Sequence, residues 1–247
     1  MTTWLIALIT LAQAQVAANP DSDAPQQLDS GTDRVHLVEL FTSEGCSSCP
    51  PADRWLQSYL DDESLWQDVV PVAFHVDYWD YLGWQDPFAH SEHASRQRQY
   101  ARQGQTSGVY TPGFLVDGEE WRGFFNRRAL NPRPSSAPRL TTTIDKGQVT
   151  VNFAATDLQQ PVVNVAILGF DLQTQVPRGE NRGKRLSHDF VVLGLEQQAL
   201  SPEASGYSGQ LRLPASRRPS QRQAIAVWVS DQSQQPLQAV GGWLEGQ

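Results

Sequence analysis

The chain has 247 residues and a formal net charge of −8, from 19 Lys and Arg against 27 Asp and Glu. This length fits one large domain or two modest ones, and 39% hydrophobic residues with eight Trp are enough for a packed core. The acidic balance argues against a nucleic-acid-binding protein, which needs a basic surface. After residue 20, no apolar run reaches the ~20 residues that span a bilayer.

The N-terminus has the features of an export signal. Residues 4–12 form a short apolar stretch, and Ala12-Gln13-Ala14 has the small-x-small pattern of a signal peptidase site. We therefore expect residues 1–18 to be a signal peptide and the polar residues 19–33 to be a linker. The alternative is an N-terminal helix that stays on the protein. Export predicts a secreted or periplasmic protein, in a compartment where a cysteine pair can persist as a disulfide.

Residues 34–133 are expected to form an α/β domain. Its elements, in chain order, are a buried strand at 35–42, an amphipathic helix at 52–60, a strand at 69–76, a polar helix at 92–103, and a strand at 114–116 that runs into the turn Asp117-Gly118. A cysteine pair separates the first strand from the first helix. This order is that of a thioredoxin-like fold with a central mixed sheet.

Residues 139–247 are expected to form an all-β domain. Three prolines within residues 131–139 mark the boundary, and Val149, Val151 and Phe153 then alternate with polar residues as in a half-buried strand. Further strands are expected at 162–170, 189–195, 210–213, 224–230 and 237–240. Turn residues separate these strands and no convincing helix pattern intervenes, so we predict a small antiparallel, sandwich-like domain.

The cysteine pair carries most of the chemical information. Cys46-Ser47-Ser48-Cys49 holds both cysteines of the chain and has the spacing and the position of a redox Cys-x-x-Cys motif. A helix N-terminus favours the thiolate, so Cys46 is the candidate attacking thiol and Cys49 the candidate resolving thiol. The alternatives are a structural disulfide and a metal-binding pair.

Four runs of sequence resemble a bacterial secreted family, the domain-of-unknown-function family 1223. They are residues 38–53, which contain both cysteines, residues 74–84, Val109-Tyr110-Thr111-Pro112, and residues 179–192 with their Gly-Glu-Asn and Leu-Ser-His triplets. The resemblance implies a thioredoxin-like fold and an exported protein. It implies no reaction, because the family is named for having no assigned function.

Wider similarity to thioredoxin-like proteins implies three further site residues in addition to the cysteines. Thr111-Pro112 matches the cis-proline loop, so Pro112 would face the cysteine pair and the backbone of Thr111 would bind a partner's chain. Glu39, in the first strand, matches a buried carboxylate that assists proton transfer to the resolving thiol, which requires a raised pKa. The alternatives are an ordinary trans-proline and a Glu39 that faces solvent or pairs with an arginine.

An aromatic and acidic segment follows the second predicted strand. His75, Asp77, Tyr78, Trp79 and Asp80 are candidates to tune the thiols, bind a metal or contact the substrate, because loops at strand ends of α/β sheets often carry sites. The alternative is an aromatic plug over the core, with the Asp residues as turn caps.

We expect an exported thiol–disulfide oxidoreductase that acts on exported protein thiols or small thiols and uses no cofactor beyond its redox-active disulfide. One alternative is a copper carrier that uses Cys46, Cys49 and His75, and another is a non-catalytic module with a structural disulfide. An oxidoreductase needs an accessible Cys46, whereas a structural disulfide is buried. Neither nucleic acid nor a membrane span is expected, and the oligomeric state stays open.

Overall fold

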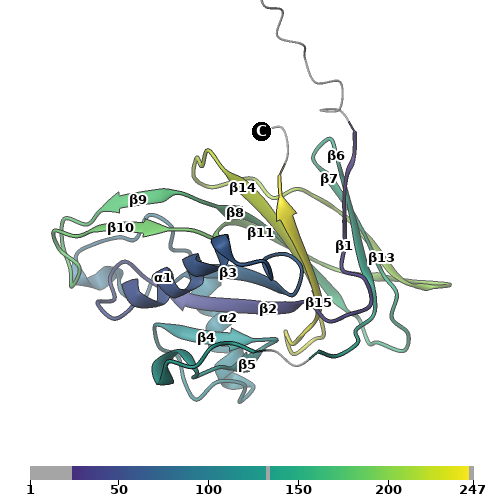
Figure 1. Cartoon of the computed structure of the whole chain (residues 1–247), viewed down its shortest axis with the longest axis horizontal. Helices are drawn as coiled ribbons and strands as arrows, with labels where there is room; N and C mark the ends of the chain where they lie inside the picture. The colour runs from purple at the N-terminus through teal and green to yellow at the C-terminus, as the bar shows by residue number, and fades with distance from the viewer. Residues whose placement is uncertain (1–23, 132–133, 245–247) are drawn as a thin grey trace, which may run out of the picture.

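The computed structural model describes residues 24–131 and 134–244. The structure is mostly β, with mixed and antiparallel sheets and few helices (Figure 1). Across these two ranges, no helix combines the length and the apolar character needed to cross a membrane. The signal peptide expected at residues 1–18 lies outside the described residues.

The first half of the chain alternates strands and helices as the sequence predicts. Its elements are β2 (His36–Thr42), α1 (Pro50–Gln57), η1 (Ser58–Asp61), β3 (Val69–His75), η2 (Asp80–Leu82), α2 (Ser91–Arg102), β4 (Gly113–Val116), β5 (Glu119–Glu120) and η3 (Phe124–Asn126). β2 runs parallel to β3 and antiparallel to β4. Helix α1 begins at Pro50-Pro51, because proline lacks an N–H and fits the first turn, where no partner is needed.

The second half contains strands and, among its described residues, no helix. Its strands are β6 (Leu140–Asp145), β7 (Gln148–Phe153), β8 (Val162–Gly169), β9 (Leu172–Gln175), β10 (Arg185–His188), β11 (Val191–Ala199), β12 (Ser201–Glu203), β13 (Gly206–Arg212), β14 (Gln223–Ser230) and β15 (Pro236–Trp243). A strand from the start of the described chain belongs with them: β1 (Gln26–Asp29) pairs antiparallel with β6. The expectation that residues 26–29 belong to a linker is wrong, since Leu28 packs against the core beneath β6.

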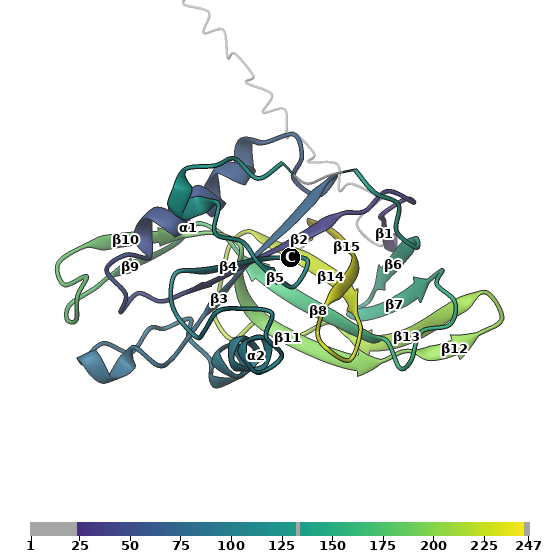
Figure 2. The same ribbon diagram turned by 90° about the horizontal axis from the view of Figure 1, so that it is seen from below.

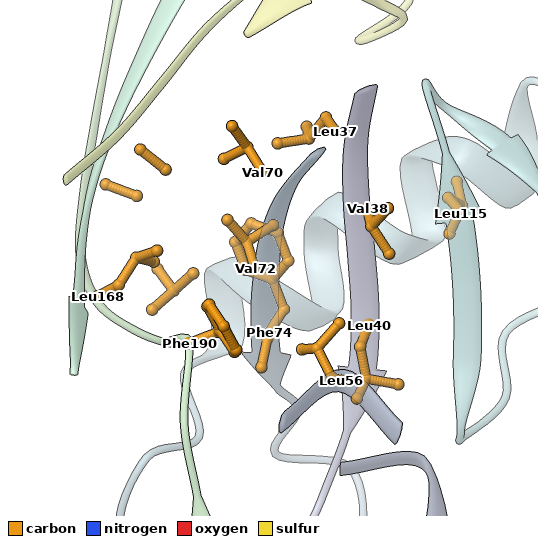
Figure 3. Packing of buried hydrophobic residues seen from close by; sticks show 14 of the residues in the cluster. Leu37, Val38, Leu40, Leu56, Val70, Val72, Phe74, Leu115, Leu168 and Phe190 are labelled. Carbon is orange, nitrogen blue, oxygen red and sulfur yellow. The ribbon is translucent and has the colours of Figure 1, made fainter. Parts of the chain in front are cut away.

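A single eight-stranded sheet joins the two halves, in the order β15-β14-β8-β11-β3-β2-β4-β5 (Figure 2). The junction is short. Val191 of β11 lies opposite Ala73 of β3 in a parallel pair, and the Ala73 N–H donates to the Phe190 carbonyl at 2.8 Å. Phe190 and Leu168 pack beside Val72 and Phe74 of β3 (Figure 3). The two halves, which lie on either side of the proline-rich stretch, therefore share one sheet and one core.

A second sheet, in the order β1-β6-β7-β13-β12, packs on the part of the large sheet formed by β8, β14 and β15. Residues of β8 alternate between two cores because side chains on a strand point to opposite faces. Val163 and Val165 face the five-stranded sheet, whereas Ala166 and Leu168 face the core shared with the first half. The second half thus buries both faces of its central strands.

The hairpin of β8 and β11 continues beyond the large sheet as a two-stranded arm, β9 paired with β10. The chain bends at Asp171 and Phe190, which have φ values of 55° and 59°. The arm lies alongside α1 in both views (Figures 1 and 2), where the Gln57 side chain donates to the Ser187 carbonyl at 2.9 Å. It brings residues of the second half to the start of α1, where the cysteine pair lies.

Candidate functional site

Cys46 and Cys49 form a disulfide at the start of α1, with 5.5 Å between their Cα atoms. Cys49 caps the helix, whose first residue is Pro50. Both cysteines are buried, with exposed fractions of 1% and 0%, while Ser47 and Ser48 between them are exposed. An oxidoreductase needs an accessible Cys46, and this conformation does not provide it.

The loop at the tip of the arm, residues 176–184, binds the backbone around the disulfide. The buried Asn181 side chain donates to the carbonyls of Glu44 and Cys46 at 2.8 and 2.9 Å. The Ser47 N–H donates to Glu180 Oε2 at 2.9 Å, and hydrogen bonds from the side chain of Ser47 and then from its backbone lower the pKa of Glu180. We call this segment the tip loop. It attaches residues near 181 to a motif 135 positions earlier in the chain.

Beside the disulfide, the buried His188 bridges two carboxyl groups. Its Nε2 lies 3.1 Å from Glu44 Oε1, and its Nδ1 lies 3.6 Å from Asp53 Oδ2. Thr42 Oγ1 donates to Asp53 Oδ1 at 2.8 Å, which orients the carboxyl group. Burial raises the pKa of Asp53, and the positive charges of His188 and His75 offset part of this increase. Asp53 follows Cys49 by four residues, so the two side chains lie one helical turn apart on one face of α1.

A second buried pair, His75 with Asp86, lies next to the first. His75 Nδ1 is 2.7 Å from Asp86 Oδ2, and Asp86 Oδ2 also accepts the Glu44 N–H at 2.8 Å. Burial lowers the pKa of His75, but the charge and hydrogen bond of Asp86 outweigh it and raise the pKa to about 8. The rings of His75 and His188 are 4.8 Å apart and nearly perpendicular. Together Glu44, Asp53, His75, Asp86 and His188 form one buried network.

The aromatic segment after β3 forms part of the wall of the site. Trp79 Nε1 donates to Thr111 Oγ1 at 2.8 Å, and Trp79 Cβ packs on Gly45, where an added Cβ would lie only 2.7 Å away. The peptide bond before Pro112, next to Thr111, is cis, as the resemblance implied. Trp79 therefore links the Thr111-Pro112 loop to the residue that precedes Cys46.

The other candidates in this segment make local hydrogen bonds. The Asp80 N–H donates to the Asp77 carbonyl at 3.0 Å, and the Asp86 N–H donates to Asp80 Oδ1 at 3.2 Å. Burial raises the pKa of Asp80. Tyr78 donates to Gln97 Oε1 at 3.0 Å, and burial raises its pKa to about 12. These contacts hold the loop against α2 and the buried network, so of the five candidates only His75 belongs to the network itself.

Glu39 has a different place from the one expected. Its carboxylate accepts hydrogen bonds from Arg96 Nε at 2.6 Å and from the Tyr100 hydroxyl at 2.7 Å, both on α2. Helices α1 and α2 lie on opposite faces of the sheet (Figure 2), so Glu39 points away from the helix that begins at the cysteine pair. The structure contains the arginine pairing that was the alternative, and the expected proton-transfer role of Glu39 is corrected. The carboxyl groups beside the pair are those of Glu44 and Asp53.

The donor set of the copper alternative is not assembled in this conformation. Over residues 24–131 and 134–244, no group of three or more His, Cys, Asp or Glu side chains is placed to hold a metal ion. Both sulfur atoms are engaged in the disulfide, while His75 Nδ1 is paired with Asp86 and His75 Nε2 has no hydrogen-bond partner. Cys46, Cys49 and His75 therefore do not fit a copper site while the pair is oxidised.

Sequence reasoning missed most of the residues that surround the disulfide: Glu44, Asp53, Asp86, Glu180, Asn181 and His188. All of them except Asp86 lie within the runs that resemble the secreted family, which is the signal that could have found them. Their roles depend on the arm folding back over α1, and no local pattern encodes that contact.

A comparison with family models agrees with the family resemblance of the four sequence runs. A family model described as protein of unknown function (DUF1223) matches residues 37–230. The chain belongs to this family. No curated protein matches it.

Two solved structures have similar folds. A structural-genomics crystal structure of a protein from Agrobacterium tumefaciens is 28% identical over 87% of this chain and 97% of its own, with a TM-score of 0.58. HBP35 of Porphyromonas gingivalis is 13% identical over 87% of this chain and 77% of its own, with a TM-score of 0.59. The second likeness shows a shared fold alone.

Proposed function

We propose that this DUF1223 protein is a thiol–disulfide oxidoreductase whose reactive group is Cys46–Cys49. The observation that carries the proposal is the buried network beside the pair, with His188 between the carboxyl groups of Glu44 and Asp53. Burying carboxyl groups and imidazoles costs free energy unless their charges are compensated. A disulfide that only joins two residues gains nothing from such neighbours, whereas a reactive pair needs groups that hold protons.

The surrounding fold supports the same proposal. Strands β3-β2-β4-β5, with β2 parallel to β3 and antiparallel to β4 and with helices on both faces, are similar in order to a thioredoxin-like domain. The cysteine pair lies after the first of these strands and at the start of α1, as it does in thioredoxin-like proteins. In this proposal the second half is a β-sandwich-like domain that supplies the arm and its histidine.

The proposed reaction transfers two electrons between thiols. A partner thiolate attacks Cys46 Sγ, the Cys46–Cys49 bond breaks, and Cys49 leaves as a thiolate that takes up a proton. A second thiolate then attacks the partner sulfur of the mixed disulfide, and Cys46 leaves as a thiolate. The partner thiols become a disulfide and the protein pair becomes reduced. The reverse sequence begins with attack by Cys46 and reduces a partner disulfide.

Asp53 and His188 are the proposed proton carriers for Cys49. Because burial raises the pKa of Asp53, its carboxyl group holds a proton at a pH where an exposed Asp is ionised. That proton can pass to the leaving Cys49 thiolate, one helical turn away, and His188 can compensate the carboxylate left behind. No group outside the chain is needed for this step.

The proposal includes the location and the partners expected from the sequence. An exported protein with this pair would act in the periplasm or outside the cell, on exported protein thiols or small thiols. The disulfide in the structure is the oxidised form of such a pair.

The test is a redox titration of the full chain in a glutathione series, with the oxidised fraction read by alkylation and mass. We expect a midpoint above about −300 mV, the value below which structural disulfides lie, and a mixed disulfide trapped in the C49S variant. Asp53→Asn should slow reduction by at least about 100-fold, as loss of a general acid does, whereas the exposed Asp145→Asn should not. A midpoint well below about −300 mV, with no trapped partner, would leave a structural disulfide.

A further inference from the structure

The tip loop is basic in a chain that is acidic overall. Arg178, Arg182 and Lys184 are exposed and Glu180 is the single acidic residue of the loop, while the whole chain carries −8. Lys184 donates to Asn181 Oδ1 at 2.9 Å. Among the described residues, the side chains of Arg178 and Arg182 have neither an ion pair nor a hydrogen bond. Two cations without a partner therefore lie on the segment that binds the backbone around the disulfide.

The same loop fills a carboxylate-binding position with a residue of its own. Glu180 is exposed to solvent, yet its Oε2 accepts the backbone N–H of Ser47 at 2.9 Å. Ser47 is the residue after Cys46, the sulfur that a partner attacks in the proposed reaction. A carboxylate on an incoming thiol can make the same hydrogen bond in place of Glu180 and arrive close to Cys46.

Two glycines allow the backbone of the tip loop to change conformation. Gly179 and Gly183 flank the residues that contact the motif and have φ values of 78° and 81°, in the left-handed region that glycine adopts without strain. Side-chain contacts of Glu180 and Asn181 hold the loop to the backbone of Ser47, Cys46 and Glu44. If another carboxylate replaced Glu180 as acceptor of the Ser47 N–H, the tip loop would lose its hydrogen bond to the residue next to Cys46.

We infer that the tip loop selects small thiols that carry carboxylate groups, which is a deeper statement of the proposed function and rests on it. The partner's carboxylate takes the Ser47 N–H from Glu180, Arg178 and Arg182 attract its negative charge, and the loop moves away from Cys46. A small partner fits this entry because Cys46 and Cys49 are buried, and Ser47 and Ser48 are the exposed residues of the motif. In the absence of a partner, the Glu180 carboxylate occupies the position that the partner's carboxylate would take.

The experiment measures reduction of the oxidised full chain by three small thiols that differ in charge: 3-mercaptopropionate, 2-mercaptoethanol and cysteamine. Rates are divided by thiolate concentration and by the rate at which the same thiolate reduces a small uncharged disulfide, because the nucleophilicity of a thiolate also changes with its pKa. We expect the anionic thiol to be at least about tenfold faster than the cationic one, the range that electrostatic attraction gives. The difference should shrink at high salt, which screens exposed charges.

Three variants make the test specific. R178E/R182E should reverse the order of the thiols, while R128E/R212E, an equal charge change at exposed arginines elsewhere, should leave it unchanged. E180A should speed reduction by all three thiols at least about threefold, because the competing carboxylate is gone. A Cys-containing acidic peptide that reacts faster than glutathione at equal thiolate concentration would overturn the assignment to small thiols.

The outcomes separate this inference from the proposed function. Rates that are fast but independent of thiol charge, in the parent chain and in R178E/R182E, would overturn the selection by charge and leave the oxidoreductase standing. Rates that are uniformly slow for every thiol and in E180A would overturn both, because the disulfide would then be closed to exchange.

Discussion

At the scale of single residues, the site is built from side chains that compensate each other's burial. His75 at the end of β3 is fully buried, and burial alone would favour its neutral form. Asp86 opposes this, because its Oδ2 accepts a hydrogen bond from His75 Nδ1 at an N–O distance of 2.7 Å. The pKa of His75 rises to about 8, and the charge of His75 lowers the pKa of Asp86 although burial opposes this. The pair is therefore ionised at neutral pH, and each partner stabilises the folded chain only while the other keeps its charge.

This pair predicts how stability depends on pH. Because the pKa of His75 is about 8 in the folded chain and 6.5 as the reference, its contribution is complete below about pH 6.5 and is lost as the pH rises through 8. The contribution is about 2 kcal/mol, at 1.36 kcal/mol per unit of pKa. Urea unfolding at pH 6 and pH 9 should show the decrease.

His75→Gln should remove most of this decrease, since an amide can donate to Asp86 without titrating. His90→Gln is the matched control, because His90 is half-buried and caps α2 at the surface. An H75Q variant with the same loss of stability between pH 6 and pH 9 as the parent chain would show that another group carries the pH dependence.

At the scale of elements, α2 is fastened to the sheet by a buried ion pair. Arg96 of α2 pairs with Glu39 of β2, and its guanidinium lies 5.2 to 5.4 Å from the ring centroids of Phe74, Tyr100 and Trp228. Trp228 belongs to β14, so one arginine joins a helix of the first half to a strand of the second. Aromatic faces attract the cation and compensate part of its desolvation.

Replacing one partner of this pair is expected to cost more than replacing both. Arg96→Met leaves Glu39 buried without its cation and should lower the free energy of unfolding by about 3–5 kcal/mol. E39L/R96M should recover most of that loss, because two apolar residues fill the space with no charge left behind. Arg98→Met, on the exposed face of α2, should change it by less than about 0.5 kcal/mol.

Chemical denaturation measures all three variants, and a double variant as unstable as R96M would contradict the argument. The same double variant tests the corrected role of Glu39. Its rate of disulfide reduction should equal that of the parent chain, because Glu39 lies on the α2 side of the sheet.

Local pattern was a good guide to individual elements. The apolar runs of β2, β3 and β14 and the helical spacing in α1 follow from side-chain periodicity, and they appear within a few residues of the predicted limits. Strands β1, β6, β9, β10 and β12 were missed. All of them except β6 have only three or four residues, and β6 contains three consecutive Thr, so no apolar alternation marks them. The disulfide partners were evident from cysteine spacing.

At the scale of the whole molecule, the two halves share one sheet. The prolines at residues 131–139 predicted a boundary between two domains. Local composition does not indicate that β11 pairs with β3 and joins the two halves. The buried network could not be predicted for the same reason, since His188 reaches Glu44 across 144 positions. A pairing of this kind is decided by the fit of β11 against β3 and by the core around Phe190.

This sheet predicts that the chain unfolds as one unit. Separating the halves would expose the β3 edge and the apolar side chains that Phe190 and Leu168 cover, so neither half gains by staying folded alone. Thermal unfolding followed by tryptophan fluorescence and by far-ultraviolet circular dichroism should give coincident single transitions. Two separate transitions, or a fragment of residues 24–131 that unfolds cooperatively, would contradict this.

The position of the arm in the sequence also determines when, during biosynthesis, the cysteine pair becomes buried. Asn181 follows Cys46 by 135 positions, so at about 5–20 residues per second the arm is synthesised roughly 7 to 27 seconds after the first cysteine. Until the arm folds back, the thiols are open to any oxidant of the compartment that the chain enters. Since the chain has only two cysteines, the single disulfide that can then close is the native one. The order in which the ribosome makes the parts therefore lets the motif be oxidised before its own chain shields it.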